Sequence, residues 1–124
     1  MPYFVLIGRD RPGTGELRQS LRPAHQDHFF APQEACVGVA GGPLLDEAGR
    51  EMAGTLLVFE AVDRAAVDRF FAEDPYNKGG LFASVEIIPW RWGLGRPQSA
   101  LSREASEGGN RPEVDPAIPS GNSR

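Results

Sequence analysis

The chain has 124 residues, 40% of them hydrophobic, which suits one domain followed by a tail. Its formal net charge of −4 gives no basic footprint for nucleic acid, and no apolar run reaches the roughly eighteen residues of a membrane-spanning helix. The single cysteine, Cys36, excludes an internal disulfide and fits a reducing compartment, so a cytoplasmic location is expected. The N-terminal residues lack a basic segment and a small-residue cleavage site, and are expected to form a strand rather than a secretory signal.

The first predicted elements are a strand and a helix. The continuous apolar run at residues 3–8 (YFVLIG) indicates a central strand. Residues 16–30 are predicted to be helical, but Pro23 is expected to interrupt them, so that the main helix begins near Arg22. Helical spacing places four side chains near one face: Leu17, Leu21, Ala24 and His28.

A hairpin is predicted next. Residues 35–40 (ACVGVA) favour a strand, which the sequence Gly41-Gly42-Pro43 is expected to end or bend. Residues 52–61, centred on TLLVFEA, indicate a third strand. A polar connection with a turn near Asp46 joins the two, so they are expected to pair with each other.

The last elements are a second helix and a fourth strand. Asp63 is the predicted N-cap of the helix, which Asp74-Pro75 then stops, leaving the Asp74 carboxylate free. Residues 76–80 are expected to form a turn because Gly79 and Gly80 permit unusual backbone angles. Residues 81–90 favour a strand with alternating faces.

The element order predicts an α+β protein of the ferredoxin-like type. The order β-α-β-β-α-β is that of a split βαβ unit, in which two helices cover one face of a four-stranded antiparallel sheet. Apolar residues alternate onto both faces, so we expect a homodimer with sheets packed face to face, a dimeric α/β barrel-type assembly. The predicted domain spans residues 1–92, and residues 93–124 form a Pro/Gly/Ser-rich tail that is expected to be disordered.

Two histidines are candidates for chemistry. His25 and His28 are neighbours on a helix, but a metal site needs further ligands and no second histidine cluster exists, so no metal is predicted. His25 suits proton transfer near neutral pH, and Asp74 is a candidate acceptor that would orient it. A structural hydrogen bond is the alternative role for such a histidine. No dinucleotide or phosphate-loop motif occurs, so no cofactor is predicted.

Three segments resemble the signatures of the YciI-like family (YCII-related domain). They are LRPAH (21–25), AGGPL (40–44) and DPYNKGGLFASVEIIPW (74–90), and their order and spacing match as well. The resemblance implies a ferredoxin-like homodimer and a catalytic pair formed by His25 and Asp74. It also implies that three residues line a substrate pocket: Arg22, Pro43 and Tyr76.

The resemblance also implies a class of activity. Members of this family resemble small-molecule enzymes, among them dehydrochlorinases of chlorinated hydroxyquinols, and most have no assigned substrate. The sequence departs from the family pattern at Gly79, where alanine is more usual, and glycine there is expected to loosen the turn slightly.

Two functions therefore remain open. The first is a lyase or isomerase-like enzyme that uses His25 and Asp74 for general acid–base chemistry on phenolic or lactone-like substrates. The second is a non-catalytic dimeric module that binds a small ligand or has a structural role. No partner other than a second copy and a small molecule is expected, neither nucleic acid nor a membrane. Whether His25 lines a solvent-reachable cleft or is closed in by side chains discriminates between the two.

Overall fold

Four strands form one antiparallel sheet in the order β2-β3-β1-β4. The computed structural model describes residues 1–31 and 33–95. In chain order the elements are β1 (Tyr3–Asp10), α1 (Gly15–Phe30), β2 (Cys36–Leu45), β3 (Met52–Ala61), α2 (Arg64–Ala72), α3 (Pro75–Lys78) and β4 (Phe82–Trp90). The predicted tail, apart from residues 93–95, lies outside the described residues. The predicted ferredoxin-like order is confirmed, with one extra short helix.

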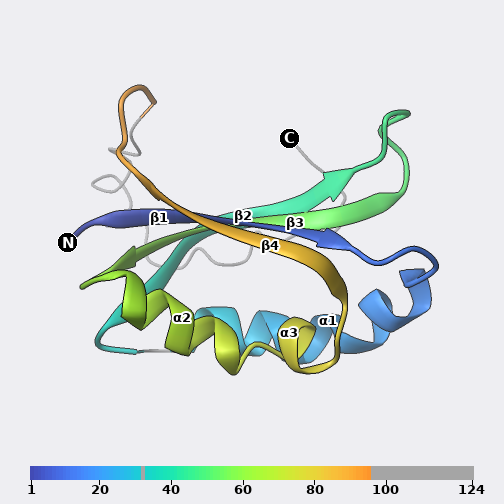
Figure 1. Ribbon diagram of the computed structural model, residues 1–124, viewed down its shortest axis with the longest axis horizontal. Coiled ribbons are helices and arrows are strands. Elements are labelled where there is room, and N and C mark those ends of the chain that lie inside the picture. Colours follow the sequence, from blue (N-terminus) through green and yellow to red (C-terminus); the bar gives the residue numbers. More distant parts are fainter. Residues whose placement is uncertain (32, 96–124) are drawn as a thin grey trace, which may run out of the picture. The chain divides into compact units, whose positions relative to one another are not determined.

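The helices all lie on one face of the sheet (Figure 1). The core forms between that face and the helices, where the paired residues Phe4 and Phe59 are 6% and 0% exposed. Leu6 and Leu57 form the next pair and are also buried. From α2, apolar side chains including Phe70 complete this cluster. Burial of these side chains is the main stabilising term for such a layer.

The second face of the sheet carries no helix of the described residues (Figure 1). Val5, Val58 and Ile88 lie side by side across three strands and share this face. Exposed apolar side chains remain on it: Val37 is 44%, Ile88 42% and Trp90 38% exposed. A sheet with one packed face and one apolar open face has surface to bury against a partner.

The structure corrects the prediction for the first helix. α1 is continuous from Gly15 to Phe30 with Pro23 inside it, so a helix beginning near Arg22 is wrong. A proline costs one backbone hydrogen bond, but packing of the helix against the sheet can outweigh that local cost. The predicted apolar stripe is also wrong in part, because Ala24 is exposed and the buried residues of α1 are Arg18 and His25.

The second strand is longer than predicted. β2 continues through Gly41-Gly42-Pro43 to Leu45, and Pro43 pairs with Thr55 of β3. A proline is tolerated there because β2 is an edge strand, where one side of the backbone needs no partner. The strand absorbs two irregularities in register, one of them between Gly38 and Ala40.

Gly79 lies where α1 and α3 approach each other closely. A Cβ atom at this position would lie 2.6 Å from Cδ1 of Leu21 and 3.0 Å from the Pro75 carbonyl oxygen. The absent side chain therefore lets α1 approach the end of α3 closely.

Candidate functional site

Two polar side chains of α1 point into the space between helices and sheet. Arg18 and His25 lie seven residues apart, which is two helical turns, so they share one face. They are 4% and 8% exposed. Because α1 runs unbroken through Pro23, His25 lies in the middle of this helix and not in its first turns.

The short helix α3 presents Asp74 to His25. Pro75 occupies the first position of α3, and Asp74 is its N-cap. The Tyr76 backbone N–H donates to Oδ1 of Asp74 at 2.8 Å. An N-cap aspartate before a first-position proline is a favourable way to begin a helix. Asp74 is only 2% exposed, and its carboxylate accepts from the Tyr76 backbone N–H in addition to the expected partner, His25.

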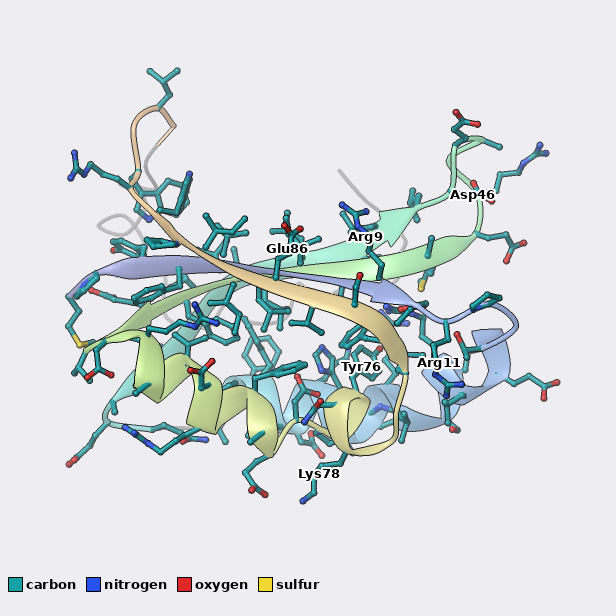
Figure 2. The ribbon with its side chains drawn as sticks, viewed as in Figure 1. Arg9, Arg11, Asp46, Tyr76, Lys78 and Glu86 are labelled. Atoms are coloured by element: carbon teal, nitrogen blue, oxygen red, sulfur yellow. The ribbon has the colours of Figure 1, made fainter. Side chains whose placement is uncertain are left out.

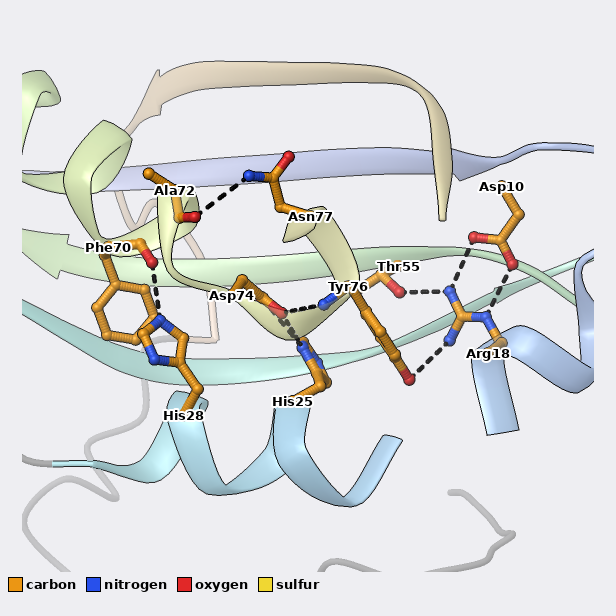
Figure 3. A network of polar contacts seen from close by, with 10 residues as sticks. All are labelled: Asp10, Arg18, His25, His28, Thr55, Phe70, Ala72, Asp74, Tyr76 and Asn77. Atoms are coloured by element: carbon orange, nitrogen blue, oxygen red, sulfur yellow. Dashed lines mark hydrogen bonds and ion pairs between the residues drawn. The ribbon is translucent and has the colours of Figure 1, made fainter. Parts of the chain in front are cut away.

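The hydrogen bond predicted between His25 and Asp74 is confirmed (Figure 3). Nδ1 of His25 lies 2.8 Å from Oδ1 and 3.1 Å from Oδ2 of Asp74. Because an ionised carboxylate only accepts, Nδ1 carries the hydrogen, which leaves Nε2 as the basic nitrogen of a neutral ring. Within residues 1–31 and 33–95, Nε2 has no hydrogen-bond partner.

Tyr76 fixes the plane of the imidazole. Its ring stacks on that of His25 with centroids 3.8 Å apart and an interplanar angle of 9°. Tyr76 is 2% exposed, and Figure 2 shows it between the sheet and the helices. Asp74 restrains one edge of the imidazole and Tyr76 one face, so the ring is held in a single orientation.

A second polar cluster, which the sequence did not predict, adjoins this pair (Figure 3). Nε and Nη2 of Arg18 donate to the two carboxylate oxygens of Asp10 at 2.8 and 3.0 Å. Nη2 also donates to Oγ1 of Thr55 at 2.6 Å, and Nη1 donates to the Tyr76 hydroxyl at 3.4 Å. The guanidinium carbon lies 4.9 Å from the centroid of the Tyr76 ring. The charge of Arg18 is thus paired and its position fixed.

The environment of Tyr76 keeps its hydroxyl protonated. Burial raises the pKa of Tyr76, because an ionised phenolate loses its hydration there. The charges of Arg18 and Arg22 oppose that rise in part. The hydroxyl therefore remains a hydrogen-bond donor at neutral pH.

The other two expected pocket residues lie at the margin of the site. Arg22 is half-buried on α1, near enough for its charge to act on Tyr76. Pro43 is exposed, and by register it lies beside Thr55 on the helix-facing side of the sheet. Thr55 on β3 is buried, whereas its partner Pro43 on the edge strand β2 is exposed to solvent. The buried layer therefore ends between these two residues. The structure thus gathers His25, Asp74 and Tyr76 closely, with Arg22 and Pro43 at the periphery.

His28 belongs to a different contact. Its Nε2 lies 2.7 Å from the Phe70 carbonyl oxygen near the end of α2, and its ring packs on Phe70. The described residues contain no group of three or more histidine, cysteine, aspartate or glutamate side chains placed to hold a metal. The two histidines of α1 therefore serve separate neighbours.

A surface cavity of about 440 Å³ is lined by α2 and by the segment that leads into β2, and neither His25 nor Asp74 lines it. Its lining includes Cys36, Arg69 and Phe70. Burial raises the pKa of the Cys36 thiol to about 11, so this cysteine is not an activated nucleophile.

None of the described helices is long and apolar enough to cross a membrane.

Comparison with known proteins identifies the family. The model of the YCII-related domain matches residues 1–91, and the chain belongs to this family. Among solved structures, 5-chloro-2-hydroxyhydroquinone dehydrochlorinase (TftG) from Burkholderia phenoliruptrix AC1100, in complex with 2,5-dihydroxybenzoquinone, is 29% identical, with a TM-score of 0.65. That match covers 73% of this chain and 95% of the dehydrochlorinase.

A structure described as an antibiotic biosynthesis monooxygenase shares the fold alone. It has a TM-score of 0.50 at 13% identity, and the match covers 75% of this chain and 99% of the other. No curated protein matches the chain significantly.

Proposed function

We propose that this protein is a small-molecule enzyme in which His25 is the general acid–base and Asp74 orients it. The observation that carries the proposal is the arrangement of the imidazole: Nδ1 bonded to a buried carboxylate, one face held by Tyr76, and Nε2 without a partner among the described residues. A base needs this combination of fixed tautomer and available nitrogen. The structural similarity to a dehydrochlorinase supports the assignment to lyase or isomerase-like chemistry.

The proposed reaction begins with proton transfer from a phenolic or lactone-like substrate to Nε2 of His25. The imidazolium that forms is stabilised by the ionised Asp74. In an isomerase-like reaction the same proton returns to a different atom of the substrate. In a lyase reaction the electron pair left by the proton expels a leaving group, which departs with its bonding electrons, and His25 later passes the proton to solvent. Arg22 is proposed to hold a substrate oxygen by a charge-assisted hydrogen bond, and Pro43 is proposed to line the same substrate pocket.

The enclosure of His25 favours a second candidate function. His25 is only 8% exposed, and its bond to Asp74 ties α1 to α3, which is what a structural histidine would do. Under this alternative the protein is a non-catalytic module. The enzyme proposal requires substrate to enter from the uncovered edge near Pro43, or α1 and β2 to separate locally.

We also propose that the protein is a homodimer formed through the open face of the sheet. The support is the apolar row of Val5, Val58 and Ile88 and the exposure of Val37 and Trp90. An aligned face-to-face packing of two such sheets would bury this surface.

Ligand-induced thermal stabilisation tests the proposed site. A panel of phenolic and lactone-like compounds, including 2,5-dihydroxybenzoquinone, would be screened against wild type, His25→Ala and His28→Ala. A ligand that binds the folded state raises the melting temperature. We expect stabilisation of wild type and of His28→Ala, the matched control, but not of His25→Ala. Equal stabilisation of both histidine variants would contradict the assignment of the site.

A further inference from the structure

Two buried hydroxyl groups converge on one guanidinium. Arg18 donates to Oγ1 of Thr55 and to the Tyr76 hydroxyl, so each hydroxyl oxygen is used as an acceptor. Each group therefore keeps its own hydrogen to donate. Within the described ranges 1–31 and 33–95, neither hydrogen has an acceptor, although Thr55 is 3% and Tyr76 2% exposed. Buried donors without a partner are unusual and costly, so both hydroxyls have the capacity to donate to a bound molecule.

Asp10 explains why Arg18 does not bind the ligand itself. Both carboxylate oxygens of Asp10 accept from Arg18, which neutralises its charge and fixes its plane. Arg18 donates to the hydroxyl oxygens of Thr55 and Tyr76, so it cannot accept their hydrogens. These hydrogens therefore point away from the guanidinium. The pair therefore suits an uncharged or partly charged oxygen, such as a carbonyl, better than a fully charged phosphate or sulfate.

This pair of hydroxyls adjoins the proposed base. The Tyr76 side chain extends from the Asp74–His25 pair to Arg18 (Figure 3). The Tyr76 backbone N–H and Nδ1 of His25 meet at Oδ1 of Asp74, and the two rings are stacked. Nε2 lies on the side of the imidazole away from Asp74, on a ring that stacks against the tyrosine ring.

We propose that the hydroxyls of Thr55 and Tyr76 form a subsite that binds a carbonyl or enolate oxygen of the substrate. The inference rests on the proposed function and narrows its substrate class to compounds whose acidic O–H or C–H is conjugated to a carbonyl group, such as hydroxylated quinones, keto tautomers of phenols and enol lactones. When His25 removes the proton, negative charge moves through the conjugated bonds to that oxygen. Preorganised O–H donors stabilise the charge where it develops. No oxidant or further reactant is needed.

The raised pKa of Tyr76 agrees with this role, because the phenol stays protonated and able to donate. Thr55 has no ionised form in the accessible pH range. Both hydroxyl groups therefore carry a hydrogen that they can donate at pH values near neutrality.

Ligand affinity in five variants, one of them His25→Ala, tests the subsite. The probes are 2,5-dihydroxybenzoquinone, which has carbonyl groups, and hydroquinone, which has none. Loss of one hydrogen bond should weaken binding of the quinone to Thr55→Val and to Tyr76→Phe about tenfold each. Thr55→Ser, which keeps the hydroxyl, should bind it like wild type. Tyr3→Phe removes a hydroxyl on the opposite face and serves as the control.

The outcomes separate this inference from the proposed function. Calorimetric titration would measure each affinity on variants shown by circular dichroism to be folded. Quinone affinity within about twofold of wild type in both Thr55→Val and Tyr76→Phe, with binding lost in His25→Ala, would overturn the subsite and leave the proposed base standing. Equal weakening of quinone and hydroquinone would also overturn it, since the carbonyl would not be the group recognised. Absence of quinone binding to wild type would contradict both proposals.

Discussion

Replacement of Asp74 tests the buried pair through stability alone, without a substrate. Asp74→Ala removes the acceptor of the Tyr76 backbone N–H and that of Nδ1 of His25. Loss of an N-cap costs about 1 kcal/mol, and an unpaired buried donor costs about 1–3 kcal/mol. The free energy of unfolding should therefore fall by about 2–4 kcal/mol.

Asp74→Asn is the matched variant, since its amide oxygen can still accept from either donor. Hydrogen bonds to a charged group are roughly twice as strong as neutral ones, so this change should cost about 1–2 kcal/mol. Asparagine is as good an N-cap as aspartate, so the remaining loss comes from the contact with His25.

A double-mutant cycle isolates that contact. His25→Phe keeps a flat ring against Tyr76 but cannot bond to Asp74. The single variants and the double variant would be unfolded in urea at one fixed protein concentration, since a dimer would make stability depend on concentration. We expect a coupling energy of about 1–2 kcal/mol. A coupling below about 0.5 kcal/mol is what independent sites give, and it would refute the account of the pair.

Two further predictions concern the open face and the cysteine. Light scattering at micromolar concentration should report twice the monomer mass of 13.4 kDa, and Ile88→Lys should shift it towards the monomer; a monomeric wild type would contradict the dimer. The pKa of Cys36, raised by burial from 9.0 to about 11, predicts slow reaction with a thiol reagent at pH 8 in the folded protein and fast reaction in urea. Because the folded value exceeds the unfolded one, the stability that this thiol contributes is present below pH 9.0 and is lost as the pH rises towards 11. Equal reaction rates in the two states would show that the thiol is accessible.

Much of the fold follows from local pattern. The bounds of β3 and the Asp63 N-cap agree with the prediction, because apolar periodicity and capping chemistry act over a few residues. Pro23 and Pro43 misled the prediction for one shared reason. Each proline removes a backbone hydrogen bond, and the effect of that loss depends on where the element lies in the fold. Pro23 is at an exposed position of a helix that packs on the sheet, and Pro43 is in an edge strand.

The site was predictable only in its most local part. Asp74-Pro75 was predicted to stop a helix, and it also starts α3 with Asp74 as the N-cap. His25 lies in a segment that resembles a family signature. Arg18, Asp10 and Thr55 were missed because their contacts span 8 to 37 residues of sequence and depend on strand register. One feature of the sequence could have indicated Arg18. It lies seven residues, or two helical turns, before His25 and therefore on the same face of α1.

Nuclear magnetic resonance of the two histidine rings tests the central claim most directly. Long-range correlations between carbon-bound hydrogens and ring nitrogens would be recorded in wild-type protein with and without 2,5-dihydroxybenzoquinone. The account predicts that the Nε2 signal of His25 moves on binding while both nitrogen signals of His28 stay in place. Binding that shifts other signals but leaves Nε2 of His25 unchanged would contradict the assignment of His25 as the group that meets the substrate.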